Sequence, residues 1–211
     1  RNCARYEAAR RERNRLLADG HLADMSWLDG LDGQLAQFGS LVADARHRMV
    51  LALALLLEEA DSSVFATPTL DLADDQIRSE DHIHDMLRRN RPADRAAGRT
   101  LRGPHRADLN VFHSAKQQPA DKCSTGEQKA LLFSIILAHA DLIADQREQR
   151  PVLLLDEVAA HLDPQRRAAL FDKLAERGGQ VWLTGTEPAL FKDIPDSALH
   201  FEVSDGTVKL R

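Results

Sequence analysis

The chain has 211 residues, of which 43% are hydrophobic, enough for one large or two small cores in a globular protein. Its net charge of -5 argues against a basic coat for nucleic acid, so any contact with DNA must be local. The apolar run from Leu51 to Leu57 is far shorter than the roughly 20 residues of a membrane-spanning helix. The two cysteines, Cys3 and Cys123, lack metal-ligand spacing and do not suggest a disulfide scaffold, which favours a reducing, cytoplasmic location.

Residues 1 to 95 are predicted to form a helical lobe. The segment from Arg1 to Ala18 is helix-prone, and a turn is expected at Asp19 and Gly20. From Trp27 to Glu59, apolar or small side chains recur at alternating steps of three and four, the heptad pattern of a helix that packs against a partner. The stripe comprises Leu28, Leu31, Leu35, Phe38, Val42, Ala45, Met49, Ala52 and Leu56.

A third helix is expected from Ser79 to Arg91. It should end there, because the stretch from Pro92 to Gly98 is rich in residues that interrupt helices. We therefore place a domain boundary between residues 95 and 96, with residues 96 to 211 forming the second domain.

The first helix is strongly basic. Because arginines spread around a helix offer several donors to a DNA backbone, Arg10, Arg11 and Arg13 are candidate DNA contacts. Acidic residues such as Glu7 and Glu12 interleave with them, so an ordinary solvated charged face explains the same pattern. The sequence leaves both interpretations open.

In the second domain, strands and helices alternate, a pattern typical of an α/β sheet flanked by helices. The expected elements are a strand Asp108 to His113, a helix Gly126 to Asp145, a strand Val152 to Leu155, a helix Pro164 to Arg177 and a strand Gln180 to Thr184. A hairpin should follow, because Asp205 and Gly206 form a dipeptide suited to a primed turn between two short apolar runs.

The strand Val152 to Leu155 is unbroken apolar sequence and leads directly into two carboxylates, Asp156 and Glu157. Such a run predicts a fully buried parallel strand, and ligands bind outside the carboxyl ends of such strands. In a nucleotide hydrolase, Asp156 would hold Mg²⁺ directly or through water, and Glu157 would polarise the attacking water. Buried strands also end in acidic residues for other reasons, so the pair alone does not decide the function.

A second motif, Ser124-Thr125-Gly126-Glu127-Gln128, stands where the long helix should begin. Ser124 and Glu127 have capping-box spacing. Helix N-termini present free N–H groups and a positive dipole, and Gly126 would let the backbone come close to a phosphate. An ordinary capped helix is the alternative explanation.

A third motif, Ala160-His161-Leu162-Asp163, follows the acids, with Pro164 opening the next helix and Asp163 as its cap. The order and spacing of the three motifs resemble those of the ABC/SMC ATPase family, in which a signature sequence, a Walker B strand and a D-loop succeed one another. The resemblance implies an α/β fold, namely part of an ABC/SMC-type ATPase head preceded by a helical arm.

Within that superfamily, the chain resembles the RecF family of recombination-mediator ATPases along nearly all of its length. The resemblance rests on the stretch from Gly103 to Leu109, which reads GPHRADL, and on the run from Leu154 through Asp163 to Arg167. In that family a helical arm interrupts the ATPase head, and the arm matches the first domain.

The resemblance implies an ATP-dependent homodimer that binds DNA. ATP and Mg²⁺ would lie between two heads, with the signature residues 124 to 128 of one subunit reaching the γ-phosphate held by the other, and Asp163 would help join the two sites. Closure on ATP would clamp DNA at gaps and single-strand/double-strand junctions. The family's partners are RecR, acting with RecO, and RecA, which they load on gapped DNA.

The chain departs from the family pattern in two ways. ABC proteins often place a histidine after the last core strand to sense the γ-phosphate, whereas Thr184 and Thr186 offer only hydroxyls here, and a polar strand end facing solvent explains these two residues equally well. No G-x-x-x-x-G-K-S/T loop occurs, so nothing cradles the β- and γ-phosphates. We therefore expect a C-terminal portion of a larger protein, which hydrolyses ATP only as part of that protein.

Two other functions fit the same motifs. A non-catalytic module kept for dimerisation or RecR binding would be expected to lose one of the acids, and both Asp156 and Glu157 are present. A transporter ATPase subunit is disfavoured by the long helical arm and by the stretch from Gly103 to Arg106. Another SMC-like ATPase remains a further alternative.

Overall fold

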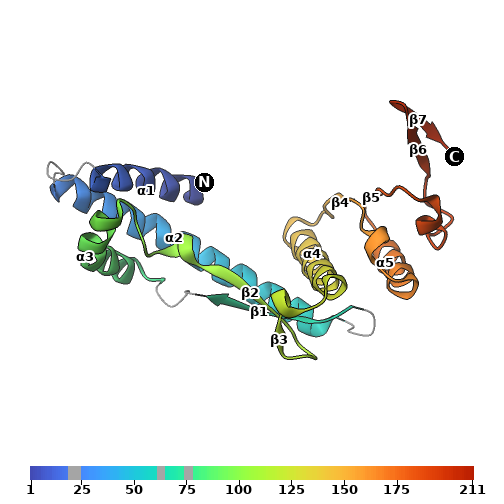
Figure 1. Cartoon of the computed structure of the whole chain (residues 1–211), viewed down its shortest axis with the longest axis horizontal. Coiled ribbons are helices and arrows are strands. Elements are labelled where there is room, and N and C mark those ends of the chain that lie inside the picture. The colour runs from blue at the N-terminus through green and yellow to red at the C-terminus, as the bar shows by residue number, and fades with distance from the viewer. Residues whose placement is uncertain (19–24, 61–64, 74–77) are drawn as a thin grey trace. The chain divides into compact units, whose positions relative to one another are not determined.

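The structure is a computed structural model that describes residues 1–18, 25–60, 65–73 and 78–211 (Figure 1). The chain divides into two compact units: unit 1 comprises Arg1–Leu55 and Thr69–Phe112, and unit 2 comprises Leu56–Pro68 and His113–Arg211. The boundary expected between residues 95 and 96 therefore lies inside unit 1. The turn expected at Asp19 and Gly20 lies outside the described residues.

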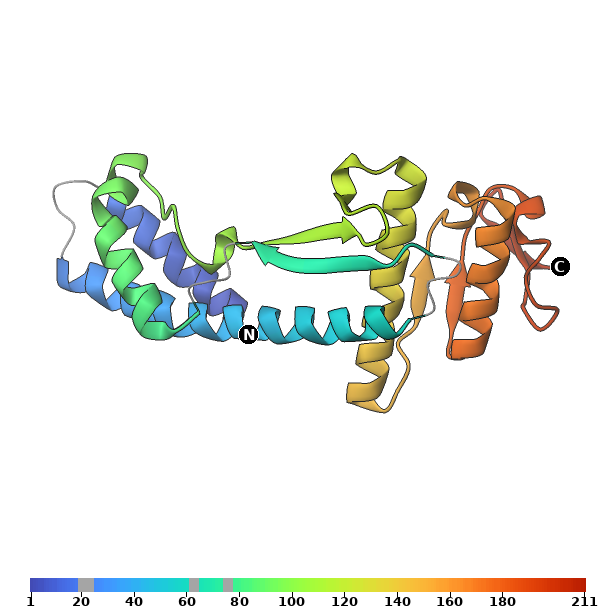
Figure 2. The same cartoon turned by 90° about the horizontal axis from the view of Figure 1, so that it is seen from below.

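The arm consists of three helices, α1 (Asn2–Ala18), α2 (Met25–Glu59) and α3 (Glu80–Ala97). Figures 1 and 2 show α1 and α3 lying against the first half of α2. They share a core to which each helix contributes, including Tyr6 and Leu16 from α1, Leu31 and Leu35 from α2, and Ile83 and Leu87 from α3. The three helices expected in this part of the chain are thus present.

The predicted heptad stripe of α2 holds only for its first half. Leu28, Leu35 and Val42 are buried as expected. Farther along, Met49 is 44% exposed, whereas Val50 and the residues that follow it at helical spacing are buried. The buried stripe shifts by one residue because an α-helix of 3.6 residues per turn drifts relative to a seven-residue repeat.

The expected end of the third helix at Arg91 is wrong, because α3 continues through Pro92 to Ala97 and ends at Gly98, which adopts a left-handed φ of 63°. A proline inside a helix costs about 3 kcal/mol, so contacts on both sides must hold the last turn. Arg91 donates from Nε to Asp32 at 2.7 Å, and the carboxylate of Asp94 accepts the backbone N–H of Leu101 at 2.9 Å. These anchors offset the cost of Pro92.

Three short strands form a sheet in the order β1 (Pro68–Ala73), β2 (Asp108–His113) and β3 (Gln118–Pro119). The prediction of β2 is confirmed. Strands β1 and β3 were not predicted, although the alternation of buried and exposed residues from Pro68 to Asp71 is the period of a strand.

The remaining elements are α4 (Thr125–Arg147), α5 (Pro164–Arg177) and the strands β4 (Leu153–Leu155), β5 (Val181–Leu183), β6 (Phe201–Ser204) and β7 (Thr207–Leu210). Single turns of 3₁₀-helix occur at Pro104–Arg106, Ala120–Lys122, Ala159–His161 and Pro188–Phe191. The predictions of both helices and of the two strands that follow them are confirmed to within a few residues. No helix of the described residues is long and apolar enough to cross a membrane.

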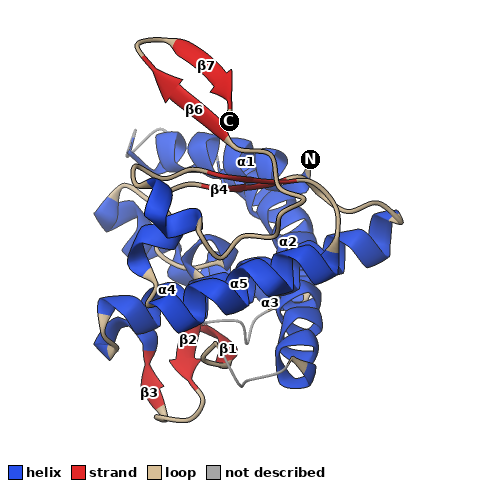
Figure 3. Ribbon diagram, turned by 90° about the vertical axis from the view of Figure 1, so that its right-hand side faces the viewer, coloured by secondary structure: helices blue, strands red, loops and turns tan. Residues whose placement is uncertain are grey.

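The predicted hairpin is also confirmed. Strands β6 and β7 pair antiparallel, with Ser204 opposite Thr207, and the two turn residues Asp205 and Gly206 have φ values of 48° and 73°. Positive φ at both central positions is the requirement of a type I′ turn. Figures 1 and 3 show the hairpin projecting beyond α5.

Strand β4 pairs with β5 in parallel, but it is not fully buried. Leu155 is 6% exposed and packs in a core with residues of α4 and α5, whereas Leu154 is 76% exposed. Successive side chains of a strand point to opposite faces, so only one face of this two-stranded sheet meets the core. The expectation of a strand buried on both faces is therefore wrong for this chain.

Candidate functional site

The two predicted acids lie at the carboxyl end of β4, beside the end of β5. Leu155 is in register with Leu183, and the N–H of Thr184 donates to the carbonyl of Leu155 at 3.1 Å. Parallel pairing therefore brings Thr184 beside Asp156 and Glu157, which we call the acid pair.

The hydroxyl of Thr184 links both residues of the acid pair. It donates a hydrogen bond to Oδ1 of Asp156 and accepts one from the backbone N–H of Glu157 at 3.2 Å. Glu157 has a φ of 54°, in the left-handed region that costs a non-glycine residue about 1–2 kcal/mol. The acid pair thus combines an oriented carboxylate with a backbone that departs from the strand conformation.

The donor set at this strand end fits Mg²⁺ only together with other ligands. Among the described residues, no cluster of three or more His, Cys, Asp or Glu residues is arranged to hold a metal ion. Mg²⁺ is commonly bound by one or two carboxylates together with water and substrate phosphates. Because Asp156 is exposed and is held through one oxygen only, it fits the role of such a carboxylate.

The signature residues form the capped start of α4. The hydroxyl of Ser124 accepts the N–H of Glu127 at 3.4 Å, and the carboxylate of Glu127 accepts the N–H of Ser124 at 3.0 Å. This is the capping box predicted from the sequence. Lys116 adds an ion pair to Glu127 at 2.5 Å, and its hydrogen bond is the largest of the causes that lower the pKa of Glu127 to about 2.

Gly126 stands in open space. A Cβ built on Gly126 would meet no atom within 4 Å, and its backbone does not require glycine. Thr125 and Gly126 occupy the first turn of α4, where backbone N–H groups have no intrahelical acceptor. The packing of this chain does not explain a glycine here, whereas a phosphate close to those N–H groups would.

Asp163 caps α5 as predicted. Its carboxylate accepts the N–H of Arg166 at 2.9 Å, and Pro164 occupies the first helical position. The side chain is exposed, so this cap is compatible with a further contact to another subunit.

The structure separates the three arginines that were expected to contact DNA. Arg11 is exposed, and Arg10 is partly exposed and forms an ion pair with Glu7 at 2.7 Å. Arg13 is fully buried, where it pairs with Asp32 at 2.5 Å and with Asp94 at 2.7 Å. The expectation that Arg13 reaches a phosphate is wrong, because its guanidinium is shielded from solvent and already neutralised.

The exposed face of α1 carries a different set of arginines. They are Arg5, Arg11 and Arg15, together with Arg1, which directly precedes the helix; all are exposed and, at 100° per residue, fall on one side. Ala4 and Ala8 lie between them, and Glu12 is the acidic residue of this face. The guanidinium of Arg5 lies over the ring of Phe38, 5.4 Å from its centroid.

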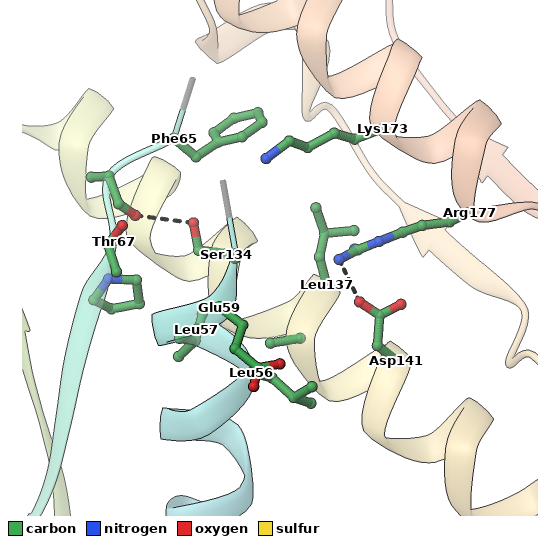
Figure 4. Close-up of a pocket in the computed structure, with 14 residues that line it drawn as sticks. Leu56, Leu57, Glu59, Phe65, Thr67, Ser134, Leu137, Asp141, Lys173 and Arg177 are labelled. Carbon is green, nitrogen blue, oxygen red and sulfur yellow. Dashed lines mark hydrogen bonds and ion pairs between the residues drawn. The ribbon is translucent and has the colours of Figure 1, made fainter. Parts of the chain in front are cut away.

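A cavity of about 240 Å³ lies elsewhere in unit 2, between the end of α2, residues 65–68, α4 and α5 (Figure 4). Arg177 of α5 pairs with Asp141 of α4 at 2.5 Å, and Lys173 lies over the ring of Phe65. Burial raises the pKa of Asp141, while Arg177 and Arg150 act in the opposite direction. Neither the acid pair nor a signature residue lines this cavity, so it is separate from the predicted site.

The structure therefore brings together Asp156, Glu157 and Thr184, and separately the signature residues. Among the described contacts, none joins these two groups. Sequence reasoning missed Lys116, because nothing in the chain order pairs it with Glu127. The structure gives Thr186 an exposed position beyond β5.

Comparison with known proteins gives a consistent result. A protein-family model described as "AAA domain, putative AbiEii toxin, Type IV TA system" matches residues 7–184. The chain is 48% identical over 217 residues to the DNA replication and repair protein RecF of Agrobacterium fabrum, and the match covers 99% of the chain and 57% of that relative. The corresponding protein of Rhizobium etli is 47% identical, with 99% of the chain and 58% of the relative covered.

A solved structure of similar fold is described as "Structure of the recombination mediator protein RecF-ATPrS in RecFOR pathway", with a TM-score of 0.77 and 19% identity over 99% of this chain and 57% of that one. A second, of RecF-ATP, gives the same TM-score at 20% identity, with 100% of this chain and 57% of that one covered. The expected fold class, a helical arm with part of an ATPase head, is confirmed. The chain spans a little over half the length of the relatives and structures that it matches.

Proposed function

Because this chain belongs to the AAA domain family, and within it to the RecF proteins, we propose that it forms the arm and the C-terminal part of the head of an ATP-gated DNA-binding protein of DNA repair. The observation that carries the proposal is the acid pair, held at the end of β4 by the hydroxyl of Thr184. An exposed carboxylate beside a second acid is the arrangement that nucleotide hydrolysis needs on a parallel strand end.

In this proposal, Asp156 contributes a ligand to Mg²⁺, and Glu157 accepts a proton from the attacking water. Mg²⁺, when bound with ATP, neutralises charge on the β- and γ-phosphates. Asp156 stays oriented by its bond to Thr184. The left-handed backbone at Glu157 directs its side chain away from the line of the strand, so the two acids serve distinct positions.

The signature residues Ser124 to Gln128 act in a second subunit. The first turn of α4 presents free N–H groups, and the open space at Gly126 admits a phosphate. Asp163, exposed at the start of α5, joins the two sites across the dimer. ATP therefore acts as the link between two copies of the protein.

DNA contacts the exposed arginines of α1. Four arginines and one glutamate on a single helix face give a local positive charge, although the net charge of the chain is -5. Phosphate contacts of this kind hold DNA without reading its sequence. From the membership in the RecF proteins we also propose specific partners, namely gapped DNA and the proteins RecR, RecO and RecA.

The test uses the full-length protein. We expect slow, DNA-stimulated ATP hydrolysis that Glu157→Gln abolishes while ATP-dependent dimerisation persists, because the change keeps the side chain's shape and removes only the base. Phosphate release and light scattering measure the two properties. Undiminished hydrolysis by the variant would remove Glu157 from its role, and dimerisation without any hydrolysis by the unmodified protein would favour a non-catalytic module.

A further inference from the structure

We infer that Thr184 is a positioning residue that holds the acid pair in its working geometry, and not a sensor of the terminal phosphate. The inference rests on the proposed roles of Asp156 and Glu157. A threonine hydroxyl has one proton to donate. In this structure the proton is donated to Oδ1 of Asp156, so none is left for a phosphate oxygen.

The backbone of Thr184 is anchored so that its hydroxyl reaches the neighbouring strand. Its N–H donates to the carbonyl of Leu155 at 3.1 Å, one residue beyond the last register pair of β4 and β5. The side chain then spans from the end of β5 to the two residues that follow β4. This cross-strand position is fixed by the sheet and does not depend on a bound nucleotide.

The same hydroxyl serves the second acid through the backbone. Its oxygen accepts the N–H of Glu157 at 3.2 Å, at the residue whose φ of 54° is left-handed. Glu157 lies beyond the end of β4, and this bond gives its backbone N–H an acceptor. The bond therefore stabilises the turn that orients Glu157. One hydroxyl thus fixes the side chain of the first acid and the backbone of the second.

The consequence for metal binding concerns the free oxygen of Asp156. With Oδ1 engaged by Thr184, Oδ2 remains to accept a metal ion in a defined direction. Groups that orient a metal ligand typically change metal affinity or activity by about 10- to 100-fold when removed. We expect Thr184 to affect metal binding in this way, by orienting the carboxylate of Asp156.

The experiment compares Thr184→Val, which keeps the shape and removes the hydroxyl, with Thr184→Ser, which keeps the hydroxyl, in the full-length protein. We expect Thr184→Val to lower kcat and to raise the Mg²⁺ concentration for half-maximal hydrolysis, each by about 10- to 100-fold, with little change in KM for ATP at saturating Mg²⁺. Thr184→Ser should keep both values within about threefold, since the bond to Asp156 is retained. A rise in KM alone would overturn the inference in favour of a phosphate sensor.

A second readout needs no nucleotide. Hydrogen exchange at the Glu157 amide should become faster in Thr184→Val, because its acceptor is lost, and should stay slow in Thr184→Ser. Thr186→Val is the matched control, since Thr186 is exposed two residues farther on and does not contact this amide. Equal exchange in Thr184→Val and the unmodified protein would contradict the inference.

The two proposals fail in different ways. If the unmodified full-length protein neither binds nor hydrolyses ATP, the proposed function fails. If it hydrolyses ATP and Thr184→Val changes neither Mg²⁺ dependence nor Glu157 exchange, only the positioning role fails. Thermal unfolding of each variant shows whether the fold is retained, and Thr184→Ser decides the matter if Thr184→Val unfolds.

Discussion

The two units handle charge in opposite ways. In unit 1, the guanidinium of Arg13 is fully buried and bonds to Asp32, Asp94 and Thr100. Further bonds from Arg91 to Asp32 and from the Leu101 N–H to Asp94 occupy these carboxylates. The chain itself satisfies nearly every polar group that it buries there.

In unit 2, by contrast, polar groups at two places are left open. Asp156 is exposed and is held by a single hydroxyl, and Gly126 faces empty space at a helix N-terminus. A buried network whose polar groups are all paired within the chain stabilises the fold, whereas exposed polar groups with few partners are free to accept a ligand. Arg13, Asp32 and Asp94 therefore hold the arm together, whereas Asp156 is available for binding.

The largest expected effect comes from breaking the buried network of unit 1. Arg13→Met leaves Asp32 and Asp94 without their shared partner in a buried site, and we expect it to destabilise unit 1 by about 3–5 kcal/mol. Urea unfolding followed by hydrogen exchange in the full-length protein would measure the loss, resolved to unit 1 and unit 2.

Arg11→Met is the matched control, two residues away on the exposed face of α1. It should change stability by less than about 0.5 kcal/mol. If Arg11 meets a phosphate, the negative slope of log affinity for DNA against log salt should become shallower by about 0.9. Equal stability of the two variants would show that the buried network does not hold the arm.

The second prediction concerns the open site of unit 2. Gly126→Ala should leave the thermal midpoint unchanged or slightly raised, since the new Cβ meets nothing within 4 Å and alanine favours a helix. It should nevertheless abolish ATP-dependent dimerisation of the full-length protein, because the methyl group would occupy the space that we propose for a phosphate. Light scattering with and without ATP measures the change.

Gly30→Ala provides the control for that result. Gly30 also lies in a helix, and a Cβ there also meets nothing within 4 Å, so its replacement should raise helix stability without affecting dimerisation. Dimerisation retained in Gly126→Ala would show that no close approach occurs at the start of α4.

Features that depend only on residues close together in the chain could be predicted from the sequence. The capping box at Ser124, the cap at Asp163 and the primed turn at Asp205 are local, and all three are present. The burial of Arg13 depends on Asp32 and Asp94, which lie 19 and 81 positions away, and no pattern in α1 distinguishes it from its exposed neighbours.

The position of the acid pair could be predicted in part, unlike the burial of Arg13. The order of strands predicted that Asp156 and Glu157 would lie at a sheet edge, and parallel pairing then placed Thr184 next to them. The direction of its hydroxyl required the structure, because a threonine two residues farther along the chain was an equal candidate. The helix end wrongly predicted at Arg91 has a similar origin. Hydrogen bonds to residues outside α3 hold the last turn in place despite Pro92, and the local sequence does not reveal them.

The smallest expected effect concerns Glu127, where unit 2 satisfies a charge internally. The pKa of Glu127 is lowered to about 2 from 4.5, first by the hydrogen bond from Lys116 and then by the N–H and hydroxyl of Ser124. Because the folded pKa lies below the usual value, the stabilisation is fully present above pH 4.5 and is lost as the pH falls towards 2. The side chain of Glu127 is 18% exposed and that of Lys116 is 48% exposed, so solvent partly screens the effect.

Lys116→Met should raise the pKa of Glu127 towards its usual value and make the cap on α4 fail at higher pH. Carboxyl ¹³C NMR of Glu127 during an acid titration would measure the shift. Lys122→Met is the control, since the ammonium of Lys122 pairs with Asp121. If the two variants titrate alike, the capping box alone accounts for the lowered pKa, and the contribution of Lys116 is too weak to matter. If the pKa of Glu127 rises only in Lys116→Met, Lys116 neutralises this carboxylate in the unmodified protein. The carboxylate then does not repel a phosphate that approaches the open backbone at Gly126.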